Sequence, residues 1–172
     1  MISSSITAEF QTRKLGMTRA STHLYGITIF LGAFLVFSVQ LLLGKYFLPW
    51  FGGTAAVWTA CMFFFQTLLL AGYAYAHWLT RLDHRMQTAV HCFVLLFSVA
   101  VLGTFAVRWG SPLLPGNALR PSDSGHPVLH LLLALCAGAA LQFFVLASTG
   151  PLLQSWFSKA NPDRSPYRLY AL

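Results

Sequence analysis

Charged residues are absent from four long stretches of this sequence, residues 20–44, 46–80, 86–107 and 124–158. A helix rises about 1.5 Å per residue and the hydrocarbon core of a bilayer is about 30 Å thick, so about 20 apolar residues can span it. Each stretch reaches that length. A soluble helix would carry charges along its exposed face. The pattern therefore predicts an all-α integral membrane bundle of four transmembrane helices.

The composition agrees with this interpretation. Only 9% of the residues are charged and 56% are hydrophobic, whereas soluble domains carry about 25% charged residues. The formal net charge of +7 would suggest nucleic-acid binding in a soluble protein. Here the basic residues flank apolar stretches, which is typical of topology signals and lipid head-group contacts. The sequence thus favours the lipid bilayer as a partner and disfavours nucleic acid.

We expect helices at about residues 24–43, 55–79, 87–107 and 128–157, within a transmembrane domain covering residues 23–158. Residues 1–22 are predicted to be a mobile cytoplasmic tail, and residues 159–172 a second cytoplasmic tail. The stretch 44–54 is predicted to be a tight interfacial turn, residues 79–87 a short connection between antiparallel neighbours, and residues 108–127 an outer loop. Met1 and Met17 both remain candidate start residues, and whether Leu172 is the natural end stays open.

The basic residues predict the orientation, because cytoplasmic segments carry an excess of Lys and Arg. With the N-terminus inside, eight basic residues lie on the inner side: Arg13, Lys14, Arg19, Arg81, Arg85, Lys159, Arg164 and Arg168. Three lie on the outer side: Lys45, Arg108 and Arg120. We therefore expect both termini to be cytoplasmic. The tryptophans are expected to be interfacial anchors, with Trp50, Trp58 and Trp109 at the outer ends and Trp78 and Trp156 at the inner ends.

The sequence contains few residues that could catalyse a reaction or bind a metal or cofactor. The acidic residues are Glu9, Asp83, Asp123 and Asp163, and none lies within a predicted span. No nucleotide-binding, metalloprotease or hydrolase motif is present. We therefore predict no catalytic residue, no metal site and no cofactor. An alternative is haem or chlorophyll binding by the three histidines of the spans, His77, His91 and His130. The favoured interpretation is that they are interfacial histidines with ordinary hydrogen bonds.

Polar and small residues within the spans predict helix packing. The amides of Gln40, Gln66 and Gln142 are expensive in lipid unless paired, so they should face other helices. We favour the interpretation that these amides hold the helices together over the alternative that they line a polar pathway for a solute. Close packing is predicted at three pairs of small residues, Thr28 with Gly32, Gly72 with Ala76, and Ala134 with Gly138. A kink is predicted at Gly150–Pro151, where freed carbonyls either line a cavity or bond to Ser148 and Thr149.

Three segments together carry a resemblance: PWFGGTAAVWTACMFFFQTLLLAGYAYAH (residues 49–77), LASTGPLLQSWF (residues 146–157) and DRSPYRLYAL (residues 163–172). They resemble the N-terminal membrane region of the bacterial spermidine-synthase-like family, in which a transporter-like region is fused to a synthase. The resemblance implies a multi-helix module in the bacterial inner membrane. It transfers no catalytic residue, because the family's soluble aminopropyltransferase-like half has no counterpart in this sequence.

Two functions remain open at this point. The favoured hypothesis is a non-catalytic accessory or structural subunit that packs laterally against other membrane-protein subunits of a larger complex, respiratory or photosynthetic. The alternative is a transport or solute-handling module, such as part of a polyamine-related transporter-like protein. In that case Gln40, Gln66, Gln142 and the break at Gly150–Pro151 are expected to line the path.

Overall fold

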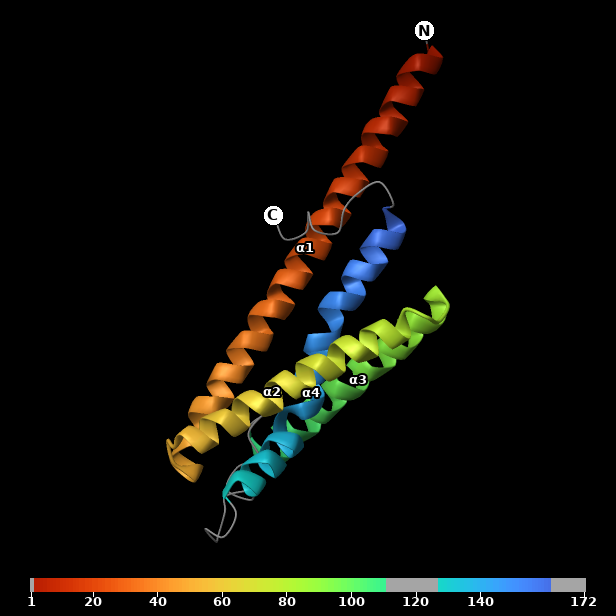
Figure 1. Cartoon of the computed structure of the whole chain (residues 1–172). Helices are drawn as coiled ribbons and strands as arrows, with labels where there is room; N and C mark the ends of the chain where they lie inside the picture. The colour runs from red at the N-terminus through yellow and green to blue at the C-terminus, as the bar shows by residue number, and fades with distance from the viewer. Residues whose placement is uncertain (1, 111–126, 162–172) are drawn as a thin grey trace.

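The computed structural model describes residues 2–110 and 127–161, with the backbone alone for residues 2–21 and 109. In these ranges the chain forms four helices and no strand: α1 (Ile2–Phe51), α2 (Ala55–Leu79), α3 (His84–Trp109) and α4 (Pro127–Ala160) (Figure 1). Each contains a stretch long and apolar enough to cross a membrane. The predicted all-α fold with four transmembrane helices is confirmed, and the chain is a multi-pass membrane protein.

Helix α1 is longer than the sequence predicts at both ends. It begins at Ile2, within the segment expected to be a tail, and continues past the expected end near Leu43 as far as Phe51. At the C-terminal end, the packing of aromatic side chains explains the extension. The side chain of Phe47 is 1% exposed, and its ring lies 5.5 Å from that of Trp50 and 6.1 Å from that of Phe51. This aromatic cluster forms only if the segment stays helical.

The connection between α1 and α2 is correspondingly short. Gly52 has a φ of 82°, a left-handed conformation that favours glycine. Its backbone N–H donates to the Leu48 carbonyl at 2.9 Å and so ends the helix. Two residues later, the side chain of Thr54 accepts a hydrogen bond from the backbone N–H of Val57 at 3.4 Å. Thr54 therefore acts as the N-cap of α2.

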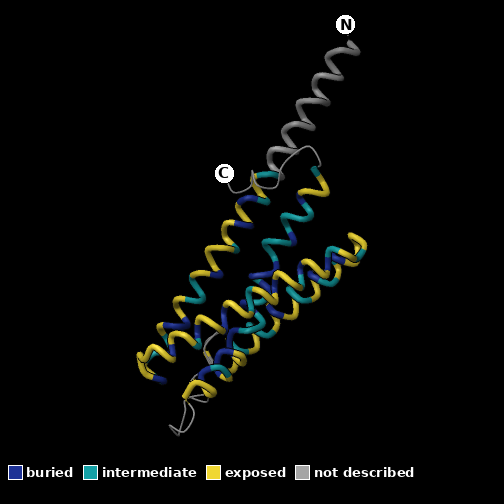
Figure 2. Tube along the Cα trace, in the orientation of Figure 1, coloured by how far each residue is buried: buried dark blue, intermediate teal, exposed yellow. Residues whose placement is uncertain are grey.

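Helix α4 is the central element, since each of the other three helices contacts it. Consecutive helices run in opposite directions, and α1 and α2 diverge from the turn that joins them (Figure 1). Helices α2 and α3 are antiparallel, as expected, but α3 contacts α4 more extensively than it contacts α2. Buried positions follow α4 and the sides of α1 and α2 that face it (Figure 2). The core of the bundle is therefore the α2–α4 pair with α1 against it.

The closest approach in the bundle lies between α2 and α4 at Gly72. A Cβ atom at this position would lie 3.0 Å from the Ala147 Cβ atom and 3.1 Å from the Ser148 backbone nitrogen. Ala76, one turn further along α2, is 2% exposed. On α4, Ala134 and Gly138 are also buried. Small residues thus let the two backbones approach, which increases van der Waals contact where lipid provides no hydrophobic drive for association.

Helices α1 and α3 each contribute only a narrow strip to the bundle. On α1 the buried positions Ile29, Val36 and Leu43 recur at the heptad spacing of a coiled-coil seam. In the most apolar 18-residue segment of each span, 22% of the residues are buried in α1 and 11% in α3, against 44% in α4. Large apolar side chains cover the remaining surface of both outer helices. The packing expected at Thr28 and Gly32 does not belong to this buried strip of α1. Thr28 is exposed, and no atom of another element lies within 4 Å of a Cβ placed at Gly32.

Several predictions from the sequence fall outside the described part of the chain. These are the outer loop at residues 111–126, the C-terminal tail from residue 162 onward, and the side chains of residues 2–21 and Trp109.

Replacing Gly72 by leucine tests the role of the α2–α4 contact. Because a side chain here meets backbone atoms of α4, Gly72→Leu should lower the free energy of unfolding by about 1–3 kcal/mol. The measurement is a denaturant titration of the detergent-solubilised protein followed by circular dichroism. Gly103→Leu is the matched control, since nothing lies within 4 Å of a Cβ at Gly103. Equal stability of the two variants would contradict the proposed role of Gly72.

Candidate functional site

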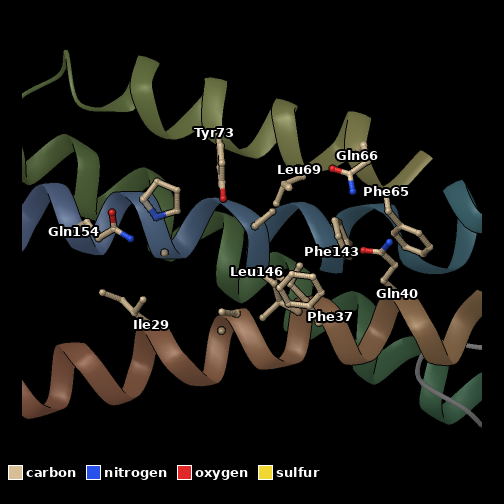
Figure 3. A pocket seen from close by; sticks show the side chains of 16 residues that line it. Ile29, Phe37, Gln40, Phe65, Gln66, Leu69, Tyr73, Phe143, Leu146 and Gln154 are labelled. Atoms are coloured by element: carbon tan, nitrogen blue, oxygen red, sulfur yellow. The ribbon is translucent and has the colours of Figure 1, made fainter. Parts of the chain in front are cut away.

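A cavity of about 640 Å³ lies between α1, α2 and α4, in the space where α1 and α2 diverge (Figure 3). We call it the α1–α2–α4 groove. Its 16 lining residues are Ile29, Gly32, Ala33, Val36, Phe37 and Gln40 of α1, Phe65, Gln66, Leu69 and Tyr73 of α2, and Phe143, Leu146, Ala147, Gly150, Pro151 and Gln154 of α4. Ligand pockets in proteins commonly have volumes of about 300–1,000 Å³. The groove is therefore large enough for a small molecule.

The groove has apolar walls and a few neutral polar groups. Gln40 and Gln66 lie near one end, and Tyr73 directs its hydroxyl group inward between the helices (Figure 3). The Gln40 amide nitrogen donates to the Met62 sulfur atom at 3.3 Å, and thioether sulfur is a weak acceptor. Gln66 is exposed on α2, towards the mouth of the groove. None of the lining residues carries a charge.

In α4, the helical hydrogen-bond pattern is interrupted where the helix lines the same groove. The helix continues through Pro151, whose ring nitrogen has no hydrogen to donate to the Ala147 carbonyl one turn earlier. The hydroxyl groups of Ser148 and Thr149 do not replace that donor, because they donate to the Val145 carbonyl at 3.0 Å and 2.7 Å. At Gly150 no side chain covers the backbone, and no atom lies within 4 Å of the position that a Cβ atom would take. Pro151 therefore leaves the Ala147 carbonyl without its helical donor, in a residue that is itself only 4% exposed.

A second polar arrangement joins α3 to α4, and we call it the α3–α4 polar seam. Among residues 84–108 of α3, the buried ones are Gln87, His91 and Ser98, and all three are polar. The Trp156 indole N–H of α4 donates to the Gln87 side-chain oxygen at 2.8 Å. One turn further along α3, the His91 Nε2 atom lies 3.3 Å from the Thr149 hydroxyl oxygen. Hydrogen bonds therefore help to fix α3 on the bundle, together with apolar packing of Val90 against the buried cluster that includes Leu79 and Leu152.

Gln87 also connects the seam to the turn between α2 and α3. Its side-chain N–H group donates to the Leu82 carbonyl at 2.7 Å and to the Thr80 carbonyl at 3.4 Å. With its oxygen atom bound to Trp156, this fully buried amide joins the end of α2, the start of α3 and the end of α4. Buried amides are stable in such places because every polar atom has a partner.

Three buried side-chain polar atoms have no hydrogen-bond partner within the described residues: the Tyr75 hydroxyl, His91 Nδ1 and Gln142 Nε2. The rings of Tyr75 and His91 are neighbours, with centroids 6.2 Å apart. Gln142 precedes Thr149 on α4 by one heptad, just as Ser98 follows His91 on α3. Because α3 and α4 are antiparallel (Figure 1), this register places Gln142 and Ser98 on the same seam.

The histidines are not gathered into one site. His91 is in the seam, whereas His77 is exposed on α2 and its Nε2 atom lies 3.4 Å from an Arg81 guanidinium nitrogen. His130 is exposed near the start of α4. None of the three lines the groove. Within the described residues, no cluster of three or more His, Cys, Asp or Glu side chains is positioned to hold a metal ion.

The tryptophans occupy different environments. Trp58 and Trp78 are exposed, at 40% and 54% of their surface. Trp50 is half-buried, with its ring 5.0 Å from that of Tyr46. Trp156 is also half-buried and uses its N–H group inside the bundle. Its hydrogen bond is therefore unavailable to a lipid head group.

Some of the residues singled out in the sequence lie in the groove or the seam, whereas His77 and His130 lie in neither. Gln40, Gln66, Gly150 and Pro151 line the groove, whereas Gln142 is buried outside its lining and His91 is in the seam. Analysis of the sequence missed Tyr73 and Gln154 of the groove and Gln87 of the seam. Gln87 could have been predicted from the sequence. It is an amide at the start of a span, directly after the charged turn, and a buried amide needs a hydrogen-bond partner.

Comparison with known proteins yields no relative of this chain: no family model, no curated protein and no solved structure matches it.

The seam can be tested at Gln87. Gln87→Leu leaves the Trp156 N–H group and the Leu82 carbonyl without their partner, so the free energy of unfolding should fall by about 1–3 kcal/mol. Amide hydrogen exchange should accelerate in α3 and in the turn before it, while α2 near Gly72 stays protected. Thr88→Val is the control, because the Thr88 hydroxyl group bonds only to its own helix, at His84. Unchanged exchange in α3 would show that the seam does not hold this helix.

Proposed function

We propose that the chain is a non-catalytic accessory subunit that packs laterally against other proteins in the membrane. The observation that carries the proposal is the open architecture of the bundle. Helices α1 and α3 each use one narrow strip for contacts within the chain, and the rest of their apolar surface faces outward. A bundle built in this way has two helices available to a neighbouring subunit.

The amide of Gln66, which has no hydrogen-bond partner among the described residues, supports the same proposal. Gln66 is exposed on a membrane-spanning helix, and a primary amide facing hydrocarbon is unfavourable unless it finds a partner. The threonines on exposed faces differ, because Thr28, Thr59 and Thr67 donate to carbonyls of their own helices at 2.8–2.9 Å. These threonine hydroxyl groups are therefore satisfied within their helices, whereas the Gln66 amide is available for an external contact.

We further propose an orientation and a membrane. The excess of basic residues on the side of both termini and the even number of spans support cytoplasmic termini. The resemblance to the membrane region of bacterial spermidine-synthase-like proteins supports the bacterial inner membrane. A respiratory or photosynthetic complex is the class of partner that we propose.

Photo-crosslinking in native membranes tests the accessory role. A benzoylphenylalanine is placed on α1 at Phe30 or on α3 at Phe93, whose side chains are 68% and 70% exposed. We expect an adduct of defined higher mass with another polypeptide from at least one of these positions. The control position is Phe143, which is 1% exposed and should give no such adduct. Adducts with lipid alone from both outer helices would overturn the proposal.

The second candidate function is a transport or solute-handling module. It is favoured by the groove, which brings Gln40, Gln66, Gly150 and Pro151 together within the bundle. The uncharged lining suits a neutral solute better than a polyamine, because a cation would lose its hydration without gaining a carboxylate partner. Uptake of radiolabelled spermidine and of glycerol into reconstituted vesicles is the test. If this function applies, glycerol flux should exceed that of empty vesicles, and flux no greater than that of empty vesicles for both solutes would rule the candidate out.

A further inference from the structure

The groove has the properties of a binding site that opens into the bilayer. Helices α1 and α2 meet at the turn containing Gly52 and diverge from it, with α4 as the floor between them (Figures 1 and 3). Their mutual contacts are far fewer than the contacts that either makes with α4. A molecule dissolved in the membrane can therefore reach the groove sideways, without crossing the head-group region.

The chemistry of the lining indicates the kind of molecule that fits. No lining residue is charged, so an ionic ligand would be desolvated without compensation. The polar groups that are present are neutral, among them the amides of Gln40 and Gln66 and the phenol of Tyr73. Phe37, Leu69 and Leu146 lie among these groups (Figure 3). This is the pattern of a site for a largely apolar ligand with a small polar head.

Two features determine how such a ligand can lie in the groove. The Gln66 side chain is exposed and has no hydrogen bond to another described residue, so its amide is available as a donor. Phe65, next to Gln66, packs against Phe143 of α4 with ring centroids 4.9 Å apart. Gly150 follows seven residues later, about 10 Å further along α4 at about 1.5 Å per residue, and no atom lies within 4 Å of the position that a Cβ atom would take there. The groove thus offers an amide donor near one end and open space for an apolar chain beyond it.

We propose that the α1–α2–α4 groove binds a neutral amphiphile from the bilayer, with a carbonyl-bearing head that accepts a hydrogen bond from the Gln66 amide and an apolar chain that runs along Phe37 and Leu69 towards Gly150. The site goes beyond the accessory role and does not depend on it, because a subunit fixed in a complex can still hold such a molecule. It also does not require transport, since binding needs no second exit. A quinone ring and the ester head of a diacylglycerol share the required chemistry.

The experiment measures binding of two probes to the full chain in phosphatidylcholine nanodiscs. Tritiated decylubiquinone represents the quinone, tritiated dioctanoylglycerol represents the ester head, and bound probe is counted after gel filtration. We expect at least one probe to bind saturably at one site per chain. The probe that binds more tightly identifies the source of the carbonyl group. Excess spermidine should not displace it, because the lining has no charge.

Two variants locate the site. Gln66→Leu removes an amide without an internal partner and should weaken binding by about 5- to 10-fold, as expected for one hydrogen bond. Gly150→Leu fills the groove from α4, where nothing lies within 4 Å, and should abolish binding. Thr67→Leu and Gly103→Leu are the matched controls outside the lining. Helical content measured by circular dichroism should be the same for all four variants.

The outcomes separate the possible occupants. Absence of saturable binding for both probes overturns the proposal, as does equal binding by Gln66→Leu and its control. Chain dimers that disappear only in Gly150→Leu would show that a helix from a second copy fills the groove, and would likewise overturn it. None of these results depends on crosslinking of the outer helices, so the failure of one proposal can be distinguished from the failure of the other.

Discussion

The bundle depends on close contact between two helices at a position without a side chain. Apolar side chains gain little by leaving lipid for protein, so membrane helices associate through van der Waals contact and hydrogen bonds. Gly72 permits that contact, because Ala147 and Ser148 of α4 occupy the space that a Cβ atom would need. The α2–α4 pair then provides the surface for α1. It also sets the floor of the groove, since Ala147, Gly150 and Pro151 follow one another on the same face of α4.

Polar side chains divide into those satisfied within one helix and those that connect helices. Threonine hydroxyls at Thr28, Thr59 and Thr67 donate to their own backbone and place no constraint on a neighbour. The longer side chains of Gln87 and His91 bond to other elements instead. Gln87 and His91 consequently define where α3 lies, while Gln66 stays available. The same physical cost of an unpaired polar group thus explains both the attachment of α3 and the chemistry of the groove.

Much of the fold is predictable from the sequence because span length and charge distribution are local properties. All four spans follow from the charge-free stretches. The end of α1 does not, since Pro49 followed by Gly52 and Gly53 resembles a turn, and only tertiary packing of Phe47 shows that the helix continues. The site is predictable in part. Composition identifies Gln40, Gln66 and Gly150 as unusual in a span, but their convergence depends on helix rotation. Gln142 is equally unusual and lies outside the groove lining.

The helices that border the groove differ in how far they exceed the thickness of a membrane. The apolar span of α1 contains 30 residues and that of α4 contains 34, so they measure about 45 and 50 Å at about 1.5 Å per residue. Both exceed a hydrocarbon thickness of about 30 Å, and such an excess is accommodated by tilting, kinking or local thickening of the bilayer. The α2 span, with 25 residues, has less excess. A change in bilayer thickness therefore acts unequally on the two helices, α1 and α2, between which the groove opens.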